Sequence, residues 1–456
     1  MKLADKILIK MPGLCCRSDK LDTDEVNRFS GHEFNDTGCS MRGAWRALQC
    51  MTDDIAIVIH GPEGCNNEFK HDCTPGIAST YSTKLTEQDI IRGGLEKLEK
   101  LVVNIDTTYK PKLIVILGTC ASELIGDDID GLVRVITPRL NSNIICLHTS
   151  GVSGLMQSQG HNLVLNELAR KVMKKQTIIP KSINYVGYSL PWDSREGRDL
   201  SELKLILDKI GVRLNAVLSS GLSYDKIVNA PAAALNVIRC PGSAYETVEY
   251  MQHEFGTPYI CPPVPIGLGN TTDFLFQIAD HFSIRKEAQP IILKEEQAIR
   301  KKINKIGHLL KGKKVAISIG ANRTIHLVRA LAELGVDIKV ISFSRLHESD
   351  DARVVGLSGR TFHCLKKVCD RYGIKATVLA CPNSTQFKNA VVKAKVDLVF
   401  DAHTHRKLAY SNGCGFFDSM NPPQPHLFYN GALALAYDLA NGFNQSFYRR
   451  YQKWMT

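Results

Sequence analysis

Four cysteines stand where a thiol could bind a metal centre. They are Cys39, Cys65, Cys120 and Cys240. The last three follow or end apolar strand-like runs, and ligands of open α/β sheets bind beyond the carboxyl ends of the strands. Thiolates are the ligands of iron–sulfur clusters, and Gly38 beside Cys39 would let inorganic sulfur approach the backbone. The pattern indicates a cluster, with two alternatives: inert buried thiols, or zinc, for which no C-x2-C pair occurs.

The rest of the composition is that of a globular chain. Its 456 residues are 44% hydrophobic and 23% charged. No apolar run reaches the roughly 18 residues of a membrane span, and the N-terminal stretch lacks a cleavage-site pattern. We therefore expect a cytoplasmic protein without membrane contact. Its fourteen cysteines are not a disulfide framework, and Cys146 and Cys381 lie in apolar runs where a thiol packs as a small hydrophobe.

The residues that give the net charge of +11 are not clustered in the sequence. Lysine and arginine are scattered, with runs only at 300–305 and 311–314, whereas nucleic-acid-binding proteins gather basic residues on one face. We therefore expect no nucleic-acid partner. Ordinary solvated surface explains this charge, and an acidic protein partner is the functional alternative, because complementary charge steers association.

Short Val/Ile-rich runs alternate with helical stretches along the chain. The expected strands are 55–61, 112–120, 143–149, 215–221, 234–240, 315–321, 337–343, 376–381 and 397–400. Continuous apolar runs of this length are typical of parallel strands buried on both faces. Residues 86–102 predict one helix, opened by a capping box of Thr86 and Asp89. Its apolar side chains recur at helical spacing: Ile90, Ile91, Leu95, Leu98 and Val102.

This alternation predicts an α/β fold of three Rossmann-like domains with parallel sheets. A Pro-containing stretch at 176–192 and a long polar helix near 283–312 are expected to be linkers. The expected domains are an N-terminal domain at 1–180, a middle domain at 181–300 and a C-terminal domain at 301–456.

Four motifs closely resemble those of nitrogenase component 1. They are Gly38-Cys39, His60-Gly-Pro-x-Gly-Cys65, Thr86-Glu-Gln-Asp-Ile-Ile-x-Gly-Gly94, and Cys120 before Leu124-Ile-Gly-Asp-Asp-Ile129. The similarity extends over almost the whole chain and is most specific in its amino half. It implies that Cys39, Cys65 and Cys120, with three cysteines of a β-type partner, hold a P-cluster-like iron–sulfur cluster at a subunit interface. The resemblance also implies an α2β2 complex.

Further segments resemble the catalytic α-type subunit. Residues 157–161 (QSQGH) follow Gly-Val-Ser and are similar to the segment beside the active-site iron–sulfur cofactor. Cys240 resembles the cysteine that ligates the terminal iron of that cofactor, and Arg323 the arginine that approaches its sulfurs. The resemblance therefore places Gln157 and His161 at the catalytic site. A histidine there can donate a hydrogen bond or a proton to substrate, since its ordinary pKa lies near neutrality.

The second cofactor ligand has several candidates. In the family it is a histidine of a short C-terminal loop, and His426 in residues 426–431 (HLFYNG) is the nearest match. The segment after this loop is shorter than in nitrogenases. Aligning backward from Gly431 puts the ligand position near Asp418, and Cys414 is a further rival. His426 as an ordinary loop residue is the remaining interpretation.

The resemblance implies a two-component reductase. A separate ATP-hydrolysing iron–sulfur protein would supply electrons, and this chain contains no G-x-x-x-x-G-K-[ST] phosphate loop of its own. Ala47 and Cys73 stand where dinitrogen-reducing relatives usually have valine and arginine, and residues 404–407 (THRK) replace the lysine expected to hold homocitrate. The roomier pocket favours methylthio-alkane reductases, which cleave carbon–sulfur bonds, over a dinitrogenase.

Two other functions compete with these reductases. A cofactor-assembly scaffold of this family keeps the cluster cysteines but generally lacks the Gln-Ser-x-Gly-His segment. A tetrapyrrole reductase lacks an equivalent of Cys240. The presence of both features in this chain favours a catalytic subunit.

Overall fold

The computed structural model describes most of the chain. The described residues are 39–65, 78–153, 157–187, 196–219, 221–343, 365–380, 382–401, 405–419 and 424–443. They form two compact units. Unit 1 contains the described residues of 194–210 and 262–456, and unit 2 contains those of 33–193 and 211–261.

The first sheet of unit 2 is parallel and has the strand order β2-β1-β3-β4. Its strands are β1 (Ile55–His60), β2 (Ser79–Ser82), β3 (Leu113–Gly118) and β4 (Asn143–His148). Every residue of β1 and β3 is buried. Alternate side chains of β1 therefore enter two different apolar clusters, one on each face of the sheet.

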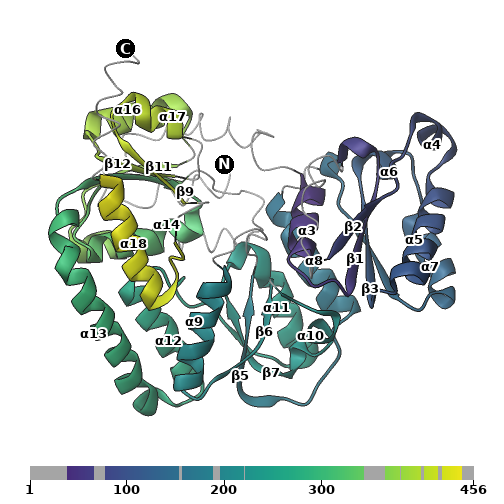
Figure 1. Cartoon of the computed structure of the whole chain (residues 1–456), viewed down its shortest axis with the longest axis horizontal. Helices are drawn as coiled ribbons and strands as arrows, with labels where there is room; N and C mark the ends of the chain where they lie inside the picture. Colours follow the sequence, from purple (N-terminus) through teal and green to yellow (C-terminus); the bar gives the residue numbers. More distant parts are fainter. Residues whose placement is uncertain are drawn as a thin grey trace, which may run out of the picture. The chain divides into compact units, whose positions relative to one another are not determined.

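Helices α3 (Ser40–Gln49), α5 (Leu95–Tyr109), α7 (Ile129–Ile136) and α8 (Gln157–Lys171) cover the two faces of this sheet (Figure 1). The short helices α4 (Glu87–Arg92) and α6 (Cys120–Leu124) lie in the connections between strands. Two 3-10 turns accompany them, η2 (Thr137–Arg139) and η3 (Gly151–Ser153). Helices α3 and α8 contribute side chains to one apolar cluster, and α5 and α7 to the other.

The single helix expected at 86–102 is wrong. The capping box of Thr86 and Asp89 is confirmed, but α4 ends after Arg92 and α5 begins at Leu95. Gly93 has a positive φ of 93°, a conformation that interrupts a right-handed helix. The break leaves Ile91 83% exposed, so it does not belong to the apolar face.

The second sheet, also in unit 2, is parallel with the order β6-β5-β7-β8. Its strands are β5 (Ile179–Val186), β6 (Arg213–Leu218), β7 (Ala233–Ile238) and β8 (Tyr259–Ile260). The helices of this part of unit 2 are α10 (Tyr224–Val228), η4 (Ala230–Ala232) and α11 (Pro241–Phe255).

The linker expected at 176–192 is wrong over its first part, because β5 is an inner strand of this sheet. A buried asparagine conceals the strand in the sequence. The side-chain amide of Asn184 donates to the carbonyl of Ala230 at 2.8 Å and to Oδ1 of Asn236 at 2.9 Å. These bonds satisfy a polar group at a position where an apolar residue would have marked the strand.

The third sheet lies in unit 1 and is parallel, with the order β11-β10-β9-β12-β13. Its strands are β9 (Lys314–Ile319), β10 (Asp337–Phe343), β11 (Thr377–Ala380), β12 (Leu398–Asp401) and β13 (Gly415–Asp418). The helices of unit 1 are α9 (Glu196–Lys209), α12 (Leu268–His281), α13 (Arg285–Leu310), α14 (Ala321–Glu333), α16 (Ser384–Ala394), α17 (Arg406–Ser411) and α18 (Phe428–Phe443). The long helix expected near 283–312 is α13, and it packs against α12 and α18 within unit 1.

The predicted α/β fold with three parallel sheets is confirmed, and each of the nine expected strands is present within a few residues. The three-domain boundaries stay a prediction. Among the described residues, no helix is long and apolar enough to span a membrane.

Candidate functional site

Three candidate cysteines follow strands at which the strand order of a sheet reverses. In the first sheet β1 and β3 are neighbours, but the chain leaves them toward opposite edges. Cys65 follows β1, and Cys120 follows β3 as the first residue of α6. In the second sheet the reversal lies between β5 and β7, and Cys240 follows β7. Such reversals open a crevice at the carboxyl ends of the strands, where α/β proteins bind ligands.

The structure brings Cys39, Cys65 and Cys120 together around Gly151. The backbone N–H of Gly151 donates to Sγ of Cys120 at 3.2 Å. A Cβ at residue 151 would lie 2.9 Å from Cβ of Cys39 and 3.6 Å from Sγ of Cys120. Burial raises the pKa of the Cys65 thiol, and the nearby thiols of Cys39 and Cys120 raise it further. All three cysteines are partly exposed in this chain.

Short buried hydrogen bonds fix the segments that carry these thiols. Ser40, which follows Cys39, donates from Oγ to the carbonyl of Thr149 at 2.8 Å. Thr119, which precedes Cys120, donates from Oγ1 to the carbonyl of His60 at 2.9 Å, at the end of β1. Each thiol is therefore held by backbone that a neighbouring strand end positions.

Three of the sequence motifs meet in one buried network. Nε2 of His60 lies 2.9 Å from Oδ2 of Asp127, and the backbone N–H of Gly94 lies 3.1 Å from both carboxylate oxygens of Asp127. Nδ1 of His60 lies 3.2 Å from Oγ1 of Thr83. Burial lowers the pKa of His60, although Asp127 opposes that shift. The network ties the turn after β1 to the loop after α6, and so positions the two strand ends that carry Cys65 and Cys120.

The donor set around Gly151 fits an iron–sulfur cluster. It offers three thiols and a backbone N–H that already donates to one sulfur. The central residue is a glycine, and a Cβ in its place would collide with Cys39. Thiolates are the usual cluster ligands, and hydrogen bonds to their sulfurs tune such centres.

Helices α3 and α8 pack so closely that only glycine fits at two positions. A Cβ on Gly43 would lie 1.9 Å from the carbonyl oxygen of Gln157, and a Cβ on Gly160 would lie 2.0 Å from that of Ser40. Cys39 immediately precedes α3. Helix α8, which carries Gln157 and His161, therefore packs directly against α3, the helix that follows the candidate cluster ligand Cys39.

His161 is 6% exposed on α8. Burial lowers its pKa to about 3, and the positive charge of Arg46 contributes to this shift. The pKa of this imidazole therefore lies below histidine's ordinary value near neutrality. The imidazole is neutral at pH 7, and it can donate one hydrogen bond but carries no additional proton to transfer.

Cys240 is the residue immediately before α11 and is partly exposed. Gly187, directly after β5, has φ of 135°, and a Cβ there would lie 2.7 Å from the backbone nitrogen of Cys240. The two ends of β5 and β7 are thus packed backbone to backbone at the reversal of the second sheet. The thiol stands where that sheet would bind a ligand.

The remaining expected residues belong to unit 1. Arg323 is exposed in the first turn of α14, beyond the end of β9. Nε2 of His426 lies 2.9 Å from Oδ2 of Asp438, so ligation that kept this contact would use Nδ1. Cys414 is the weaker rival, because it is 4% exposed and its thiol donates to the carbonyl of Val396 at 3.3 Å. The implication of the resemblance that Arg323 and His426 share one cofactor site with Cys240 and His161 stays a prediction.

The structure gives little support to the larger substrate pocket that was inferred from Ala47, Cys73 and residues 404–407. Ala47 is buried in the apolar cluster of unit 2 with Leu48 and Met41. Cys73 and residue 404 lie outside the described residues. Asp418, the alternative ligand position, forms an ion pair with Arg406 at 2.5 Å.

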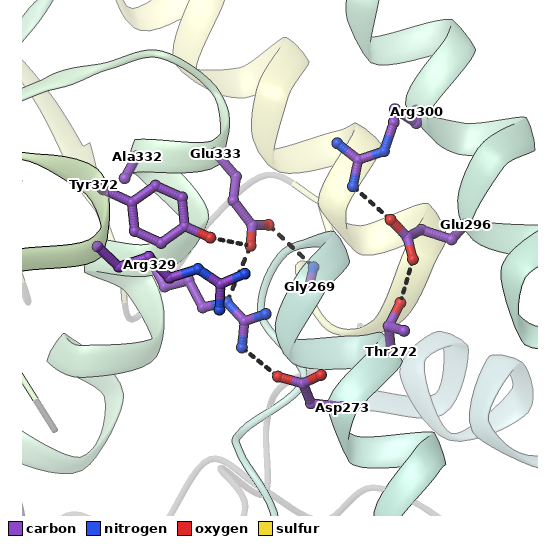
Figure 2. A pocket seen from close by; sticks show the side chains of 10 residues that line it. Gly269, Thr272, Asp273, Glu296, Arg300, Arg329, Ala332, Glu333 and Tyr372 are labelled. Carbon is purple, nitrogen blue, oxygen red and sulfur yellow. Dashed lines mark hydrogen bonds and ion pairs between the residues drawn. The ribbon is translucent and has the colours of Figure 1, made fainter. Parts of the chain in front are cut away.

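Unit 1 also contains a polar cavity of about 460 Å³ that sequence reasoning missed. Figure 2 shows Arg329 between Asp273 and Glu333, and Arg300 beside Glu296. The Arg329–Asp273 pair joins α14 to α12, and Oγ1 of Thr272 on α12 donates to Glu296 of α13 at 2.8 Å. The cavity's charges are largely neutralised by one another, which indicates a structural role.

The comparisons with known proteins agree with the motifs. Residues 39–444 match the family described as "Nitrogenase component 1 type Oxidoreductase". This chain belongs to the nitrogenase component 1 family. The resemblance noted in the sequence is thus confirmed at the family level.

Curated relatives of two kinds match this family member. One is "Nitrogenase iron-molybdenum cofactor biosynthesis protein NifE" of Clostridium pasteurianum, 28% identical over 94% of this chain and 91% of that protein. Another is "Nitrogenase molybdenum-iron protein alpha chain" of Methanothermococcus thermolithotrophicus, 25% identical over 89% and 86%. The solved structure "Nitrogenase Cp1 at pH 5" shares the fold with a TM-score of 0.77, at 21% identity, over 98% of this chain and 99% of that chain.

Proposed function

We propose that this chain is the catalytic α-type subunit of an ATP-dependent two-component reductase. The observation that carries the cluster part of the proposal is the convergence of Cys39, Cys65 and Cys120 around Gly151; the segment with Gln157 and His161 carries the catalytic part. Their partial exposure suits a P-cluster-like centre completed by cysteines of a β-type partner, in an α2β2 complex. A separate ATP-hydrolysing iron–sulfur protein would supply the electrons.

The chain's own residues would act in two places. Cys39, Cys65 and Cys120 would hold the shared cluster, with the N–H of Gly151 stabilising charge on one sulfur. Cys240, with His426 as the proposed second ligand, would hold an active-site iron–sulfur cofactor, which supplies multi-electron reduction when bound. Arg323 would stabilise negative charge on that cofactor. Gln157 and neutral His161 would donate hydrogen bonds to substrate or cofactor.

For the substrate we propose methylthio-alkanes. The reaction would be R–S–CH3 + 2 e⁻ + 2 H⁺ → RH + CH3SH, with both electrons from the partner reductase. The support is the sequence departure at Cys73 and the altered stretch at 404–407; Ala47 adds none, because it is buried in the apolar cluster of unit 2. Dinitrogen gains little from a larger pocket, because its binding depends on the metal and nearby proton donors. Dinitrogen reduction to ammonia is the alternative substrate assignment.

A cofactor-assembly scaffold is the second candidate function, and a specific observation favours it. The NifE relative of Clostridium pasteurianum matches 94% of this chain, against 89% for the alpha chain of Methanothermococcus thermolithotrophicus, and among the described residues the geometry secures no second cofactor ligand. The segment with Gln157 and His161 supports the catalytic assignment.

The decisive assay combines the chain with a β-type subunit and an ATP-hydrolysing iron–sulfur reductase. With ATP and reductant, we expect methane from dimethyl sulfide in excess of ammonia from dinitrogen. The substrate 2-(methylthio)ethanol would give ethylene, methanethiol and water for the same two electrons and two protons. Ammonia without hydrocarbon would make the complex a dinitrogenase. Transfer of a cofactor to a cofactor-free catalytic subunit, with neither product formed, would make it a scaffold.

A further inference from the structure

A second set of metal-ligand atoms lies at the carboxyl end of β4. Cys146 and His148 are two residues apart on this strand, so both side chains leave the same face. Asp130 of α7 faces them, and Nε2 of His148 lies 2.7 Å from its Oδ2. One ligand atom from each of Asp130, Cys146 and His148 lies within 4.8 Å of the other two.

A fourth group approaches this set from α6. Oε1 of Glu123 is buried without a hydrogen-bond partner, and it lies 3.7 Å from Nδ1 of His148. A buried carboxylate oxygen without a donor costs free energy, because water no longer solvates it. A cation at this place would supply the missing interaction.

The electrostatic surroundings also favour a cation. The negative charges of Asp130, Glu123 and Glu167 lie near Cys146, against one opposing lysine, Lys171. That lysine is itself paired with Glu167 at 2.9 Å. The carboxylates repel one another and any thiolate, so a divalent ion would relieve repulsion among all of them.

We propose that Asp130, Cys146 and His148 bind one divalent transition-metal ion of the zinc type, with water as the fourth ligand and Glu123 beside Nδ1 of His148 as the group that orients the imidazole. Thiolate, imidazole and carboxylate together suit Zn²⁺, whereas Mg²⁺ and Ca²⁺ prefer oxygen ligands alone. Usual zinc bond lengths in a tetrahedron would hold the nitrogen and oxygen about 3.3 Å apart and the sulfur about 3.6 Å from each. The side chains therefore need to move by only about 1 Å.

An ion here would connect elements that surround the proposed cluster site. It would join the end of β4, three residues before Gly151, to α7 and, through Glu123, to α6, which begins at Cys120. His148 and Asp130 have side chains 55% and 48% exposed, so an ion can reach them from solvent. The site is distinct from the proposed cluster ligands, because it uses none of them.

Anaerobic titration of the purified full-length chain with cobalt chloride tests this proposal. Cobalt replaces zinc in such sites and shows a sulfur-to-cobalt charge-transfer band when a thiolate binds it. Cys39, Cys65 and Cys120 can bind cobalt as well, so the measurement is the difference between variants. We expect wild type to bind one more cobalt equivalent than His148→Asn, and Cys146→Ser to lose that equivalent with part of the charge-transfer intensity.

His253→Asn is the matched control, because His253 is an exposed histidine on α11. It should bind as much cobalt as wild type. Zinc should raise the thermal midpoint of wild type and of His253→Asn more than that of His148→Asn, since a ligand stabilises the state that binds it. Equal cobalt stoichiometry in wild type, Cys146→Ser and His148→Asn would overturn the proposal, whatever happens at the cluster cysteines.

Discussion

Replacing Gly160 by alanine should push α3 and α8 apart. The new Cβ would lie 2.0 Å from the carbonyl oxygen of Ser40 and 2.7 Å from the backbone nitrogen of Ala44. Both neighbours are backbone atoms, which cannot rotate away. Non-bonded atoms pack best at about 3.5 Å or more, so the two helices would have to separate by more than about 1 Å.

The expected loss of stability follows from two opposing effects. Alanine in place of glycine stabilises a helix by roughly 0.5–1 kcal/mol. Overpacking a tight interface costs about 1–3 kcal/mol, and sometimes more. Because the overlap is severe, we expect the free energy of unfolding of unit 2 to fall by about 1–2 kcal/mol in Gly160→Ala. Cys39 immediately precedes α3, so iron binding by the chain should fall as well.

Urea unfolding followed by the fluorescence of Trp45 measures this effect. Trp45 lies on α3, where its Nε1 donates to Oγ1 of Thr80 at 2.9 Å. The chain's other tryptophans, Trp192 and Trp454, would be replaced by phenylalanine, since a chain of two units need not unfold in one step.

Gly242→Ala is the matched control, because Gly242 is exposed in the first turn of α11 and a Cβ there would have no atom within 4 Å. It should leave stability unchanged or raise it by up to about 1 kcal/mol. If Gly160→Ala proved as stable as wild type, the close packing of α3 on α8 would be refuted.

Two further perturbations test the buried groups of unit 2. The folded pKa of His161 is about 3, below the unfolded value of about 6.5, so its contribution to stability is complete above pH 6.5 and is lost as pH falls. Between pH 7 and 5 this loss should be about 2 kcal/mol. Urea unfolding of His161→Gln should therefore show a free energy of unfolding that depends less on pH than that of wild type. An unchanged pH dependence would contradict the burial of this imidazole. Asp127→Ala should lower the free energy of unfolding by about 3 kcal/mol, because His60 and the N–H of Gly94 both lose their buried acceptor. Asp53→Ala, at an exposed position, should cost less than about 0.5 kcal/mol, and equal effects of the two alanine variants would contradict the network.

The sequence predicts a segment well where one physical factor dominates it. Strands β1 and β3 are apolar on both faces, and their continuous Val/Ile runs were sufficient to locate them. Strand β5 carries the buried Asn184, whose partners come from 46 and 52 residues away, so no local pattern could identify it. Strand β2 is a partly exposed edge strand with the sequence STYS. It has no apolar run, so the sequence pattern did not predict it.

Some features of the candidate site could be predicted from the sequence and others could not. The convergence of Cys65 and Cys120 could be expected, because both follow strands of one parallel sheet. The burial of Cys414 and the low pKa of His161 depend on packing between distant helices and strands, which spacing does not reveal. The approach of Asp130 to Cys146 and His148 requires α7 to lie over β4. The spacing of Cys146 and His148, two residues apart on a predicted strand, was the one local signal for that site.

The central claim is that Cys39, Cys65 and Cys120 bind an iron–sulfur cluster. Its most direct test is anaerobic reconstitution of the full-length chain with iron and sulfide, alone and with its β-type partner, followed by iron analysis and electron paramagnetic resonance. Wild type should bind iron and give a cluster signal that grows with the partner. Alanine variants of each of the three cysteines should lose that signal, whereas Cys414→Ala, at a buried core thiol, should keep it. Retention of the full signal by all three variants would contradict the claim.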